Sequence, residues 1–326
     1  MTNPVSLLYL FGVAEEDSFA LISRGKTLLY ISALNYSEVK KIVKASRLSI
    51  ISNREKVAEY LRSLAGRKIG FESSNLTVRG LSVWKKMLRQ AKLMPTTNLI
   101  EDLRLVKDKE EITLIRKAAG IADTVFQELR PMIRPGVTER FIAGKIDALI
   151  REKGCEPAFK TIVASGQNTA VPHHAVSSRT LKKNDIVMLD FGAVYKGYRS
   201  DLTRTIFLGK INKLHQCLYD LVAAAQSEAI KAVGPGVKTE SIDRDARSII
   251  AKAGYGNYFI HSTGHGLGLE THESPRVSSK DTTTLHPGMV VTVEPGIYLP
   301  RCGGVRIEDM VLVTTTGREV LTKAAK

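Results

Sequence analysis

Two 20-residue segments of the chain match each other: PGVTERFIAGKIDALIREKG (residues 135–154) and PGVKTESIDRDARSIIAKAG (residues 235–254). They share a Pro-Gly-Val start, two isoleucines and a final glycine at matching positions. In each, the Pro-Gly turn precedes apolar residues at helical spacing, and a glycine is a typical helix stop. Each segment is therefore predicted to form a turn followed by a helix.

The match continues downstream of both segments. Leu181 precedes Asp190 by nine residues in LKKNDIVMLDFG, and Leu285 precedes Glu294 by nine residues in LHPGMVVTVEPG. Two matches in the same order indicate a duplicated α/β half-domain rather than chance. Two such halves facing each other would bring Asp190 and Glu294 toward one central site.

Upstream of the repeat, short apolar runs alternate with helical patterns, which predicts a small α/β domain. We expect strands at 18–23, 27–32, 47–52 and 67–71, and helices at 37–45, 55–64 and 78–91. The stretch MTNPVSLLYLFGVAEED has no Lys or Arg before its apolar run, so it is read as a strand rather than a secretory signal. An amphipathic helix that begins at Asp108 is expected to lead into the second domain. The predicted domains are residues 1–104 and 105–326.

Composition excludes several classes of protein. The 326 residues are 43% hydrophobic and 25% charged, which excludes a disordered or fibrous chain. No apolar run approaches the roughly 18–20 residues that cross a bilayer, so no membrane partner is expected. The cysteines at 155, 217 and 302 are far apart and odd in number. They predict neither a disulfide framework nor a CxxC metal site, and a reducing, cytoplasmic location fits them.

The net charge of +15 is concentrated toward the N-terminus, where residues 1–107 hold 18 Lys and Arg against 9 Asp and Glu. A basic lobe raises the possibility of nucleic-acid or acidic-partner binding. No RGG tract, zinc finger or long basic helix accompanies the charge. A solvated surface is the simpler interpretation, and a nucleic-acid partner is not expected.

Strand-like segments of the repeat region carry acidic residues. They are Asp190 within 186–191, Asp201 at the head of 201–208, Glu294 after 289–293, and Glu308 and Asp309 within 305–313. An acid in a buried strand costs several kcal/mol unless it is paired or binds a metal. Acids on several core strands favour one shared cation. Strand alternation places Glu308 on the same face as Arg306, whereas Asp309 points the other way and is expected to be structural.

Five of the seven histidines lie near these acids: His173, His174, His261, His265 and His272. In HSTGHGLGLETHE, the glycines that flank His265 let the backbone approach closely and indicate a loop or strand, not a helix. Carboxylate-rich ligation with one imidazole suits Mn, Co or Zn. Five protein ligands exceed the needs of one open zinc, which indicates two metal ions about 3.5–4 Å apart that activate a bridging water for attack on a carbonyl.

Five motifs in order carry a family resemblance: LDFGA with Asp190, SDLTRT with Asp201, GHGLGLETHE with His265, VEPGIY with Glu294 and RIED with Glu308. The chain resembles the pita-bread metallopeptidases, in particular the Xaa-Pro dipeptidase (prolidase) and Xaa-Pro aminopeptidase branch. That resemblance implies a creatinase-like N-terminal α/β domain and a pita-bread domain with an internal pseudo-twofold repeat. The C-terminal two-thirds carries the motifs, and the N-terminal lobe has none.

The resemblance also implies a ligand set. Asp190 would ligate one metal ion, His265 and Glu294 the other, and Asp201 and Glu308 would bridge both. Glu294 would in addition act as the general base. Manganese or cobalt would be the metals, with zinc as an alternative.

Further roles follow from the same resemblance. His173 and His272 would contact the substrate and stabilise the oxyanion, and His261 would line the pocket. Arg306 would support Glu308 or bind substrate. Arg276 either holds the free carboxylate of a dipeptide or is a surface arginine. The second histidine of the His-His pair is expected to be a bystander.

The resemblance implies a dinuclear exopeptidase, in homodimers, that cleaves small peptides with proline at the second position. The bond before proline is a tertiary amide without an N–H, so ordinary proteases cannot hydrogen-bond it as a strand. Dipeptidase and aminopeptidase remain open, and methionine aminopeptidase is a weaker option. The alternative from another class is an inactive pita-bread module that binds protein or nucleic acid through its basic lobe.

Overall fold

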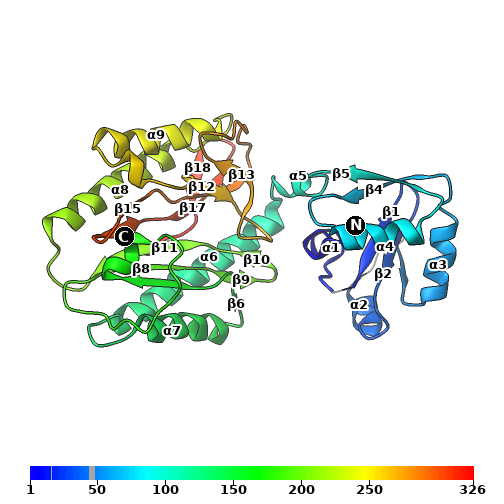
Figure 1. Cartoon of the computed structure of the whole chain (residues 1–326), viewed down its shortest axis with the longest axis horizontal. Coiled ribbons are helices and arrows are strands. Elements are labelled where there is room, and N and C mark those ends of the chain that lie inside the picture. The colour runs from blue at the N-terminus through cyan, green and yellow to red at the C-terminus, as the bar shows by residue number, and fades with distance from the viewer. Residues whose placement is uncertain (16, 44–47) are drawn as a thin grey trace. The chain divides into compact units, whose positions relative to one another are not determined.

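The computed structural model describes residues 1–15, 17–43 and 48–326. Internal contacts divide the chain into two compact units, Met1–Arg104 and Leu105–Lys326 (Figure 1). Both units combine helices with strands, so the predicted α/β class is confirmed. Within the described residues, no helix has the length and apolar character that a membrane crossing needs.

The first unit contains a three-stranded sheet and a parallel strand pair. Its elements are α1 (Pro4–Phe11), β1 (Phe19–Ile22), β2 (Thr27–Tyr30), α2 (Tyr36–Ile42), β3 (Leu48–Ile51), α3 (Arg54–Arg62), β4 (Lys68–Glu72), α4 (Val78–Met87), β5 (Lys92–Thr96) and α5 (Glu101–Arg104). Strand β2 is central, antiparallel to β1 and parallel to β3. Its residues Leu28 and Leu29 point to opposite faces and are both fully buried, so each face of the sheet has its own core.

The N-terminal stretch forms helix α1, so its prediction as a strand was wrong. The Asn3 side chain accepts a hydrogen bond from the Val5 N–H, and Pro4 occupies the first helical position. Gly12 ends the helix in the left-handed region with a φ of 70°. These start and stop signals outweigh the short apolar run between them.

The remaining predictions for the first unit differ from the structure mainly at the end of one helix. The helix predicted at 78–91 ends at Met87, and the following residues form β5, which pairs with β4 in parallel. The predictions for 37–45 and 47–52 include residues 44, 45 and 47, which lie outside the described residues.

The second unit begins with a long helix and then alternates strands and helices. Its elements are α6 (Lys109–Leu129), η1 (Arg130–Met132), α7 (Glu139–Glu152), β6 (Glu156–Pro157), β7 (Ile162–Ser165), η2 (Gly166–Ala170), β8 (Ile186–Phe191), β9 (Ala193–Tyr195), β10 (Tyr198–Arg199), β11 (Leu202–Phe207), α8 (Lys213–Ala232), α9 (Thr239–Lys252), η3 (Gly256–Tyr258), β12 (Gly264–Gly266), β13 (Glu273–Val277), β14 (Val290–Val293), β15 (Gly296–Leu299), β16 (Gly303–Arg306), β17 (Asp309–Val313) and β18 (Arg318–Val320). Helix α6 starts at the predicted cap, where Asp108 and Glu111 form a capping box.

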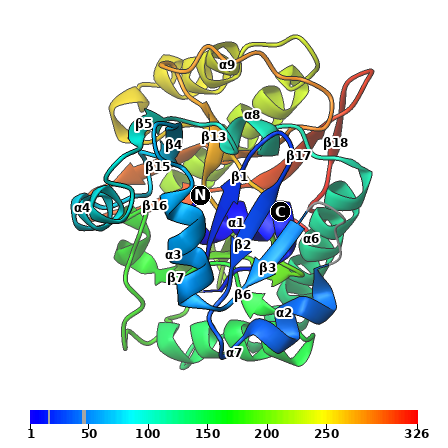
Figure 2. The same cartoon turned by 90° about the vertical axis from the view of Figure 1, so that its right-hand side faces the viewer.

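Helices cover the strands of the second unit from two sides. Helices α8 and α9 lie on one side and α6 and α7 on the other (Figures 1 and 2). One core packs α6 and α7 against β8 and β11 around Phe126, and a second packs α8 and α9 against β14 and β17 around Val291. The central sheets have the orders β11-β8-β7 and β13-β12-β14-β17-β18. Each half of the unit therefore has its own hydrophobic core.

The duplication predicted from the sequence is confirmed in the backbone. Helices α7 and α9 each have 14 residues. Gly136 and Gly236 have φ values of 94° and 82°, which favour glycine. The Gly136 N–H donates to Leu181 O at 2.9 Å, and the Gly236 N–H donates to Leu285 O at 2.8 Å. The same turn therefore precedes the same helix in both halves.

The predicted strand at 305–313 is interrupted in the structure. Strand β16 ends at Arg306 and pairs with β15, whereas β17 begins at Asp309 and pairs with β14. The chain thus passes from one sheet to another at residues 307–308. Simple alternation cannot be applied across this break.

Candidate active site

The five predicted ligand residues all line one cavity of about 810 Å³ in the second unit. Asp190 lies on β8, Asp201 directly precedes β11, His265 lies on β12, Glu294 directly follows β14, and Glu308 lies between β16 and β17. The first half of the repeat thus supplies two of these side chains, and the second half supplies three. Asp201, Glu294 and Glu308 lie just outside strands, whereas Asp190 lies within β8, which is paired on both sides.

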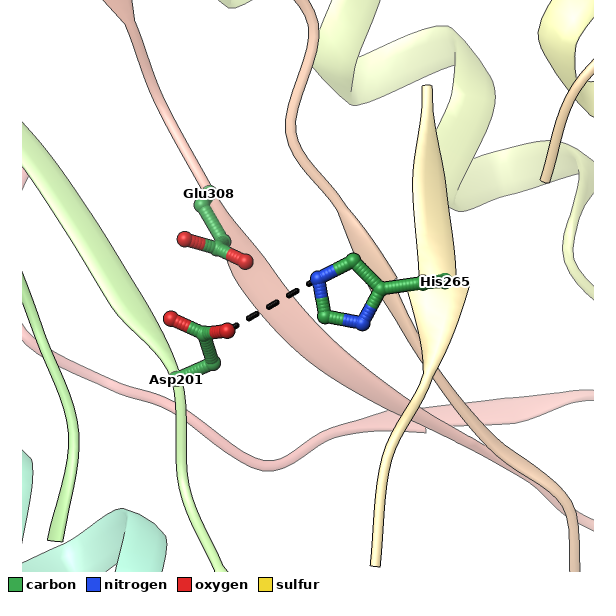
Figure 3. A group of neighbouring side chains, drawn as sticks. All are labelled: Asp201, His265 and Glu308. Atoms are coloured by element: carbon green, nitrogen blue, oxygen red, sulfur yellow. Dashed lines mark ion pairs between the residues drawn. The ribbon is translucent and has the colours of Figure 1, made fainter. Parts of the chain in front are cut away.

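Three of these side chains point toward one another (Figure 3). One potential ligand atom from each of Asp201, His265 and Glu308 lies within 4.8 Å of the other two. His265 Nε2 is 3.7 Å from Asp201 Oδ2 and 3.3 Å from Glu294 Oε1. The arrangement is compact enough for one cation to reach several of these groups.

Glycines on either side of His265 allow β12 to fit between its neighbours. A Cβ on Gly264 would lie 1.9 Å from Thr292 O, and one on Gly266 would lie 2.2 Å from Ser274 O. No side chain is tolerated at these distances. The Gly-His-Gly sequence therefore presents the imidazole to the cavity while β13 and β14 close in on both sides.

Asp190 and Glu294, which occupy matching positions in the repeat, have different partners. Asp190 Oδ2 accepts a hydrogen bond from Arg306 Nη2 at 2.5 Å. Burial nevertheless raises the pKa of Asp190 above its usual value. Burial acts on Glu294 in the same direction, but the hydrogen bond with His265 and nearby positive charge lower its pKa to about 2.

Asp201 and Glu308 are buried acids, and nearby hydrogen bonds and positive charge offset the cost of their burial only weakly. Burial, followed by mutual repulsion among the acids, raises the pKa values of both well above the usual range. Among the described residues, Asp190 Oδ1 and Glu308 Oε1 are buried without a hydrogen-bond partner. Unpaired buried carboxylate oxygens beside an imidazole are the donors that hard and borderline divalent cations take, so the residues present fit a metal centre.

Arg306 is bound on every side by the protein. It donates to Thr203 Oγ1 at 3.1 Å, to Pro172 O at 3.2 Å and to Tyr298 Oη at 2.8 Å, in addition to Asp190. Its side chain is only 3% exposed. These contacts place Arg306 beside the acids, as its sequence position predicted, although it pairs with Asp190 rather than with Glu308.

Tyr298, which the sequence did not single out, contacts two residues that line the cavity. Its hydroxyl accepts from Arg306 and is 2.8 Å from His261 Nε2, so it joins the predicted pocket histidine to the buried arginine. Burial raises the pKa of Tyr298 to about 12, which keeps the hydroxyl protonated. The VEPGIY motif contains this tyrosine, but its two partners lie 37 and 8 residues away and could not be read from it.

The predicted substrate-binding histidines all border the cavity. The His272 ring stacks edge-on against His265 with 4.4 Å between ring centroids. Burial lowers the pKa of both His272 and His261, which favours neutral rings. His173 reaches the cavity from the loop that follows η2.

Two residues that line the cavity differ from the sequence prediction: His174 has an unexpected partner, and Lys160 was not predicted. His174, expected to be a bystander, lines the cavity and lies 2.9 Å from the buried Glu139 carboxylate. Arg276 is exposed and lines the cavity, and so does Lys160, which sequence reasoning did not identify. Lys160 belongs to no recognisable motif, so the sequence carries no signal for it.

Asp309 faces away from the cavity, as expected for a structural residue. Its carboxylate accepts from Arg204 at 2.7 Å, from Gln226 at 2.8 Å and from Thr322 at 2.8 Å. Arg204 also donates to the backbone carbonyl of Glu308. This network fixes the back of the segment that carries Glu308.

Comparison with known proteins places the chain in a family. Residues 113–315 match the model of "Metallopeptidase family M24", and residues 1–106 match the "Creatinase/Prolidase N-terminal domain". A Xaa-Pro dipeptidase of Pyrococcus furiosus is 38% identical over 330 residues, which cover 100% of this chain and 93% of that protein.

Solved structures agree with this placement. The Xaa-Pro dipeptidase from Bacillus anthracis superposes with a TM-score of 0.94 at 38% identity, covering 98% of this chain and 91% of that one. The X-Pro aminopeptidase from Thermotoga maritima gives a TM-score of 0.92 at 31% identity, covering 99% and 93%. The creatinase-like and pita-bread architecture implied by the family resemblance is confirmed, and the comparisons favour the enzyme over the inactive binding module. The chain belongs to metallopeptidase family M24 and carries the creatinase/prolidase N-terminal domain.

Proposed function

We propose that the protein is a dinuclear metal-dependent exopeptidase that hydrolyses the peptide bond before proline. One observation carries this proposal: four acids and a histidine from both halves of the repeat surround a single cavity, and two of their buried carboxylate oxygens have no hydrogen-bond partner among the described residues. The names of the relatives, Xaa-Pro dipeptidase and X-Pro aminopeptidase, support the specificity for proline.

In this proposal Asp190 binds one ion, His265 and Glu294 bind the other, and Asp201 and Glu308 bridge them. Both bridging acids adjoin His265 (Figure 3), which supports their central place. Two bound cations would then neutralise the repulsion among the acids that raises the pKa values of Asp201 and Glu308. Manganese or cobalt is the proposed native metal.

When bound, two divalent ions would polarise the substrate carbonyl and lower the pKa of a water molecule. Glu294, kept ionised by its contact with His265, would accept the proton of that water. His173 and His272 border the cavity and would donate hydrogen bonds to the developing oxyanion. His261, oriented by Tyr298, would line the pocket for the proline ring.

Arg276 and Arg306 would have separate tasks. The exposed Arg276 at the cavity would hold a substrate carboxylate, which favours a dipeptidase. Arg306 donates its hydrogen bonds to groups of the protein, which supports the interpretation that it orients Asp190 rather than binding substrate. An aminopeptidase acting on longer peptides is the competing candidate, favoured by the similarity to the Thermotoga maritima enzyme.

The decisive experiment compares Gly-Pro and Leu-Pro with a longer Xaa-Pro-Yaa peptide, using protein loaded with manganese or cobalt. Cleavage of the dipeptides alone indicates a dipeptidase, and cleavage of the longer peptide indicates an aminopeptidase. Matched peptides with alanine in place of proline serve as the control. If the protein cleaves neither kind of proline substrate, the assignment is wrong.

We also propose that residues 1–104 and 105–326 are the N-terminal and catalytic domains of a cytoplasmic homodimer. Light scattering after gel filtration measures the assembly, and elemental analysis after purification without chelator identifies the metal. A monomer would contradict the dimer, and a metal-free protein that retains nucleic acid through moderate salt would instead favour a binding module.

A further inference from the structure

Glu139, a buried acid of the second unit, lies outside the cavity and accepts its side-chain hydrogen bonds from a loop rather than from its own helix. Glu139 begins α7 and is fully buried. Its Oε1 accepts from the Ser165 N–H and hydroxyl at 2.8 and 2.7 Å and from Asn168 Nδ2 at 2.9 Å. Its Oε2 accepts from the Ser177 N–H and hydroxyl at 3.1 and 2.6 Å and lies 2.9 Å from His174 Nε2.

These donors lie at both ends of the segment 165–177, which carries His173 to the cavity. In the same segment, the Pro172 carbonyl accepts a hydrogen bond from Arg306. The segment therefore also contacts the guanidinium group that pairs with Asp190. A single carboxylate therefore determines where the chain enters and leaves the loop around His173. Glu139 itself is absent from the residues that line the cavity.

The second half of the repeat has a corresponding device. Asp243 on α9 is fully buried and accepts from the Thr263 N–H at 3.2 Å and hydroxyl at 2.8 Å. It also pairs with Arg247 at 2.9 Å. Arg247 in turn donates to the carbonyls of Phe259 and His261, both at 2.9 Å. The acid and its arginine thus hold the segment that carries His261.

The two acids are not at matching positions of the repeat. Glu139 corresponds to Thr239, and Asp243 corresponds to Ala143. Positions four residues apart lie on the same face of a helix, so each half presents one acid from the same inward face, one turn apart. The halves have different residues but the same result, which indicates that holding the loop is the task.

We propose that Glu139 is a positioning residue for His173, and that Asp243 is its counterpart for His261. Each acts through the loop it binds and touches neither the substrate nor the metal ligands. The inference rests on the proposed function for the contact of His173 with substrate. Glu139→Gln replaces an acceptor oxygen by an amide NH₂ group, so donors on one side of the loop lose their partner.

A double-mutant cycle tests whether Glu139 acts through His173. For Glu139→Gln in metal-loaded enzyme we expect kcat to fall on the order of 10–100-fold, because a small displacement of a catalytic group costs up to about 10² in rate. KM and metal content should stay near wild type. The double variant with His173→Ala should be no slower than His173→Ala alone. Additive losses would overturn the proposal.

Glu111→Gln is the matched control for this cycle. Glu111 is a buried acid of the same unit that accepts from the Asp108 N–H and the Tyr198 hydroxyl, both at 2.8 Å, and it does not line the cavity. Its variant should leave kcat within about twofold of wild type, because its bonds fix the start of α6 and join it to β10 rather than holding a loop that carries a pocket histidine. A loss equal to that of Glu139→Gln would point to general destabilisation.

Hydrogen–deuterium exchange of the full chain tests the same inference without activity. We expect Glu139→Gln to accelerate exchange in 166–177 on the order of tenfold while 259–263 stays unchanged, and Asp243→Asn to do the reverse. If the wild-type enzyme cleaves no proline peptide, the proposed function is wrong. The exchange experiment still tests whether Glu139 holds the segment 166–177. Unchanged exchange in 166–177 would overturn the proposal. Ser177→Ala, which removes one donor, gives a milder change in the same direction should Glu139→Gln not fold.

Discussion

Asp190 and Glu294 stand at the same position in the two halves of the repeat, yet their chemistry differs. Asp190 meets an arginine, and burial still raises its pKa, whereas Glu294 meets His265 and a more positive surrounding that lowers its pKa to about 2. Asp190's arginine, Arg306, comes from the opposite half of the repeat. The duplication therefore explains where the acids lie, and contacts between the halves set their charge.

The largest expected effect tests whether both halves are needed at one centre. Asp201→Asn from the first half and Glu308→Gln from the second should each lower turnover on the order of 10³-fold or more, because a neutral amide bridges two cations poorly and several kcal/mol of stabilisation are lost. Metal content and kcat measured together check this. Full activity with full metal content in either variant would show that the ligand assignment is wrong.

The next effect concerns the loop anchor of the first half. Burial opposes ionisation of Glu139, but the hydrogen bonds from Ser177, Ser165, Asn168 and His174 lower its pKa from 4.5 to about 2. Its ionised form therefore stabilises the fold above about pH 4.5 by on the order of 3 kcal/mol, and this is lost as the pH falls through 2. Glu139→Gln should be less stable than wild type at pH 7, with the difference vanishing near pH 2.

Calorimetry is the suitable measurement for that pH series. The single tryptophan, Trp84, lies in the first unit, so its fluorescence does not report directly on the unit that contains Glu139. Glu111→Gln again provides the comparison. A stability difference that did not change between pH 7 and pH 2 would contradict the assignment of the shifted pKa to Glu139.

A smaller effect compares a pocket histidine from each half. His272→Ala, and separately His173→Ala, should lower turnover by about 10²-fold, the usual cost of one oxyanion donor, with metal content near normal. His272 packs on the ring of His265, so it is the stricter test. Concurrent loss of both metals in His272→Ala would move this residue into the ligand set.

The smallest effect concerns the start of the two repeat helices. The Thr138 side chain accepts from the Phe141 N–H at 3.1 Å and caps α7, whereas Lys238 at the matching place gives α9 no side-chain cap. Lys238→Thr should raise the free energy of unfolding by about 1 kcal/mol, and Thr138→Ala should lower it by about as much. Thermal unfolding checks both, and no gain from Lys238→Thr would show that the α9 start is already satisfied by other groups.

Much of the second unit could be predicted from its sequence because strong local signals coincide there. Strand β8 has the predicted bounds, and α6 starts after its predicted cap, because a buried strand and a capping box are both encoded within a few residues. The duplication could also be read, since Pro-Gly turns and helix-stopping glycines are nearly obligatory where φ is positive.

What the sequence could not predict depends on distant partners or on competing local signals. Tyr298 and Glu139 acquire their roles from residues far along the chain, so no spacing identifies them. The apolar run of α1 favours a strand, but the cap at Asn3, the proline at Pro4 and the stop at Gly12 make it a helix. The strand predicted at 305–313 breaks because Glu308 leaves one sheet for the next.

The contacts that join β11 to the segment before β17 have a practical consequence for recombining this chain with its relatives. Thr203 donates its hydroxyl to Glu308 at 2.7 Å, and Thr205 donates its hydroxyl to Arg306 O at 2.8 Å. A chimera with a breakpoint between these strands would combine side chains selected against different partners. Exchange of the whole span from α6 to Lys326 keeps every such pair together, and also keeps Asp309 with Thr322, so the crossover should be placed before α6.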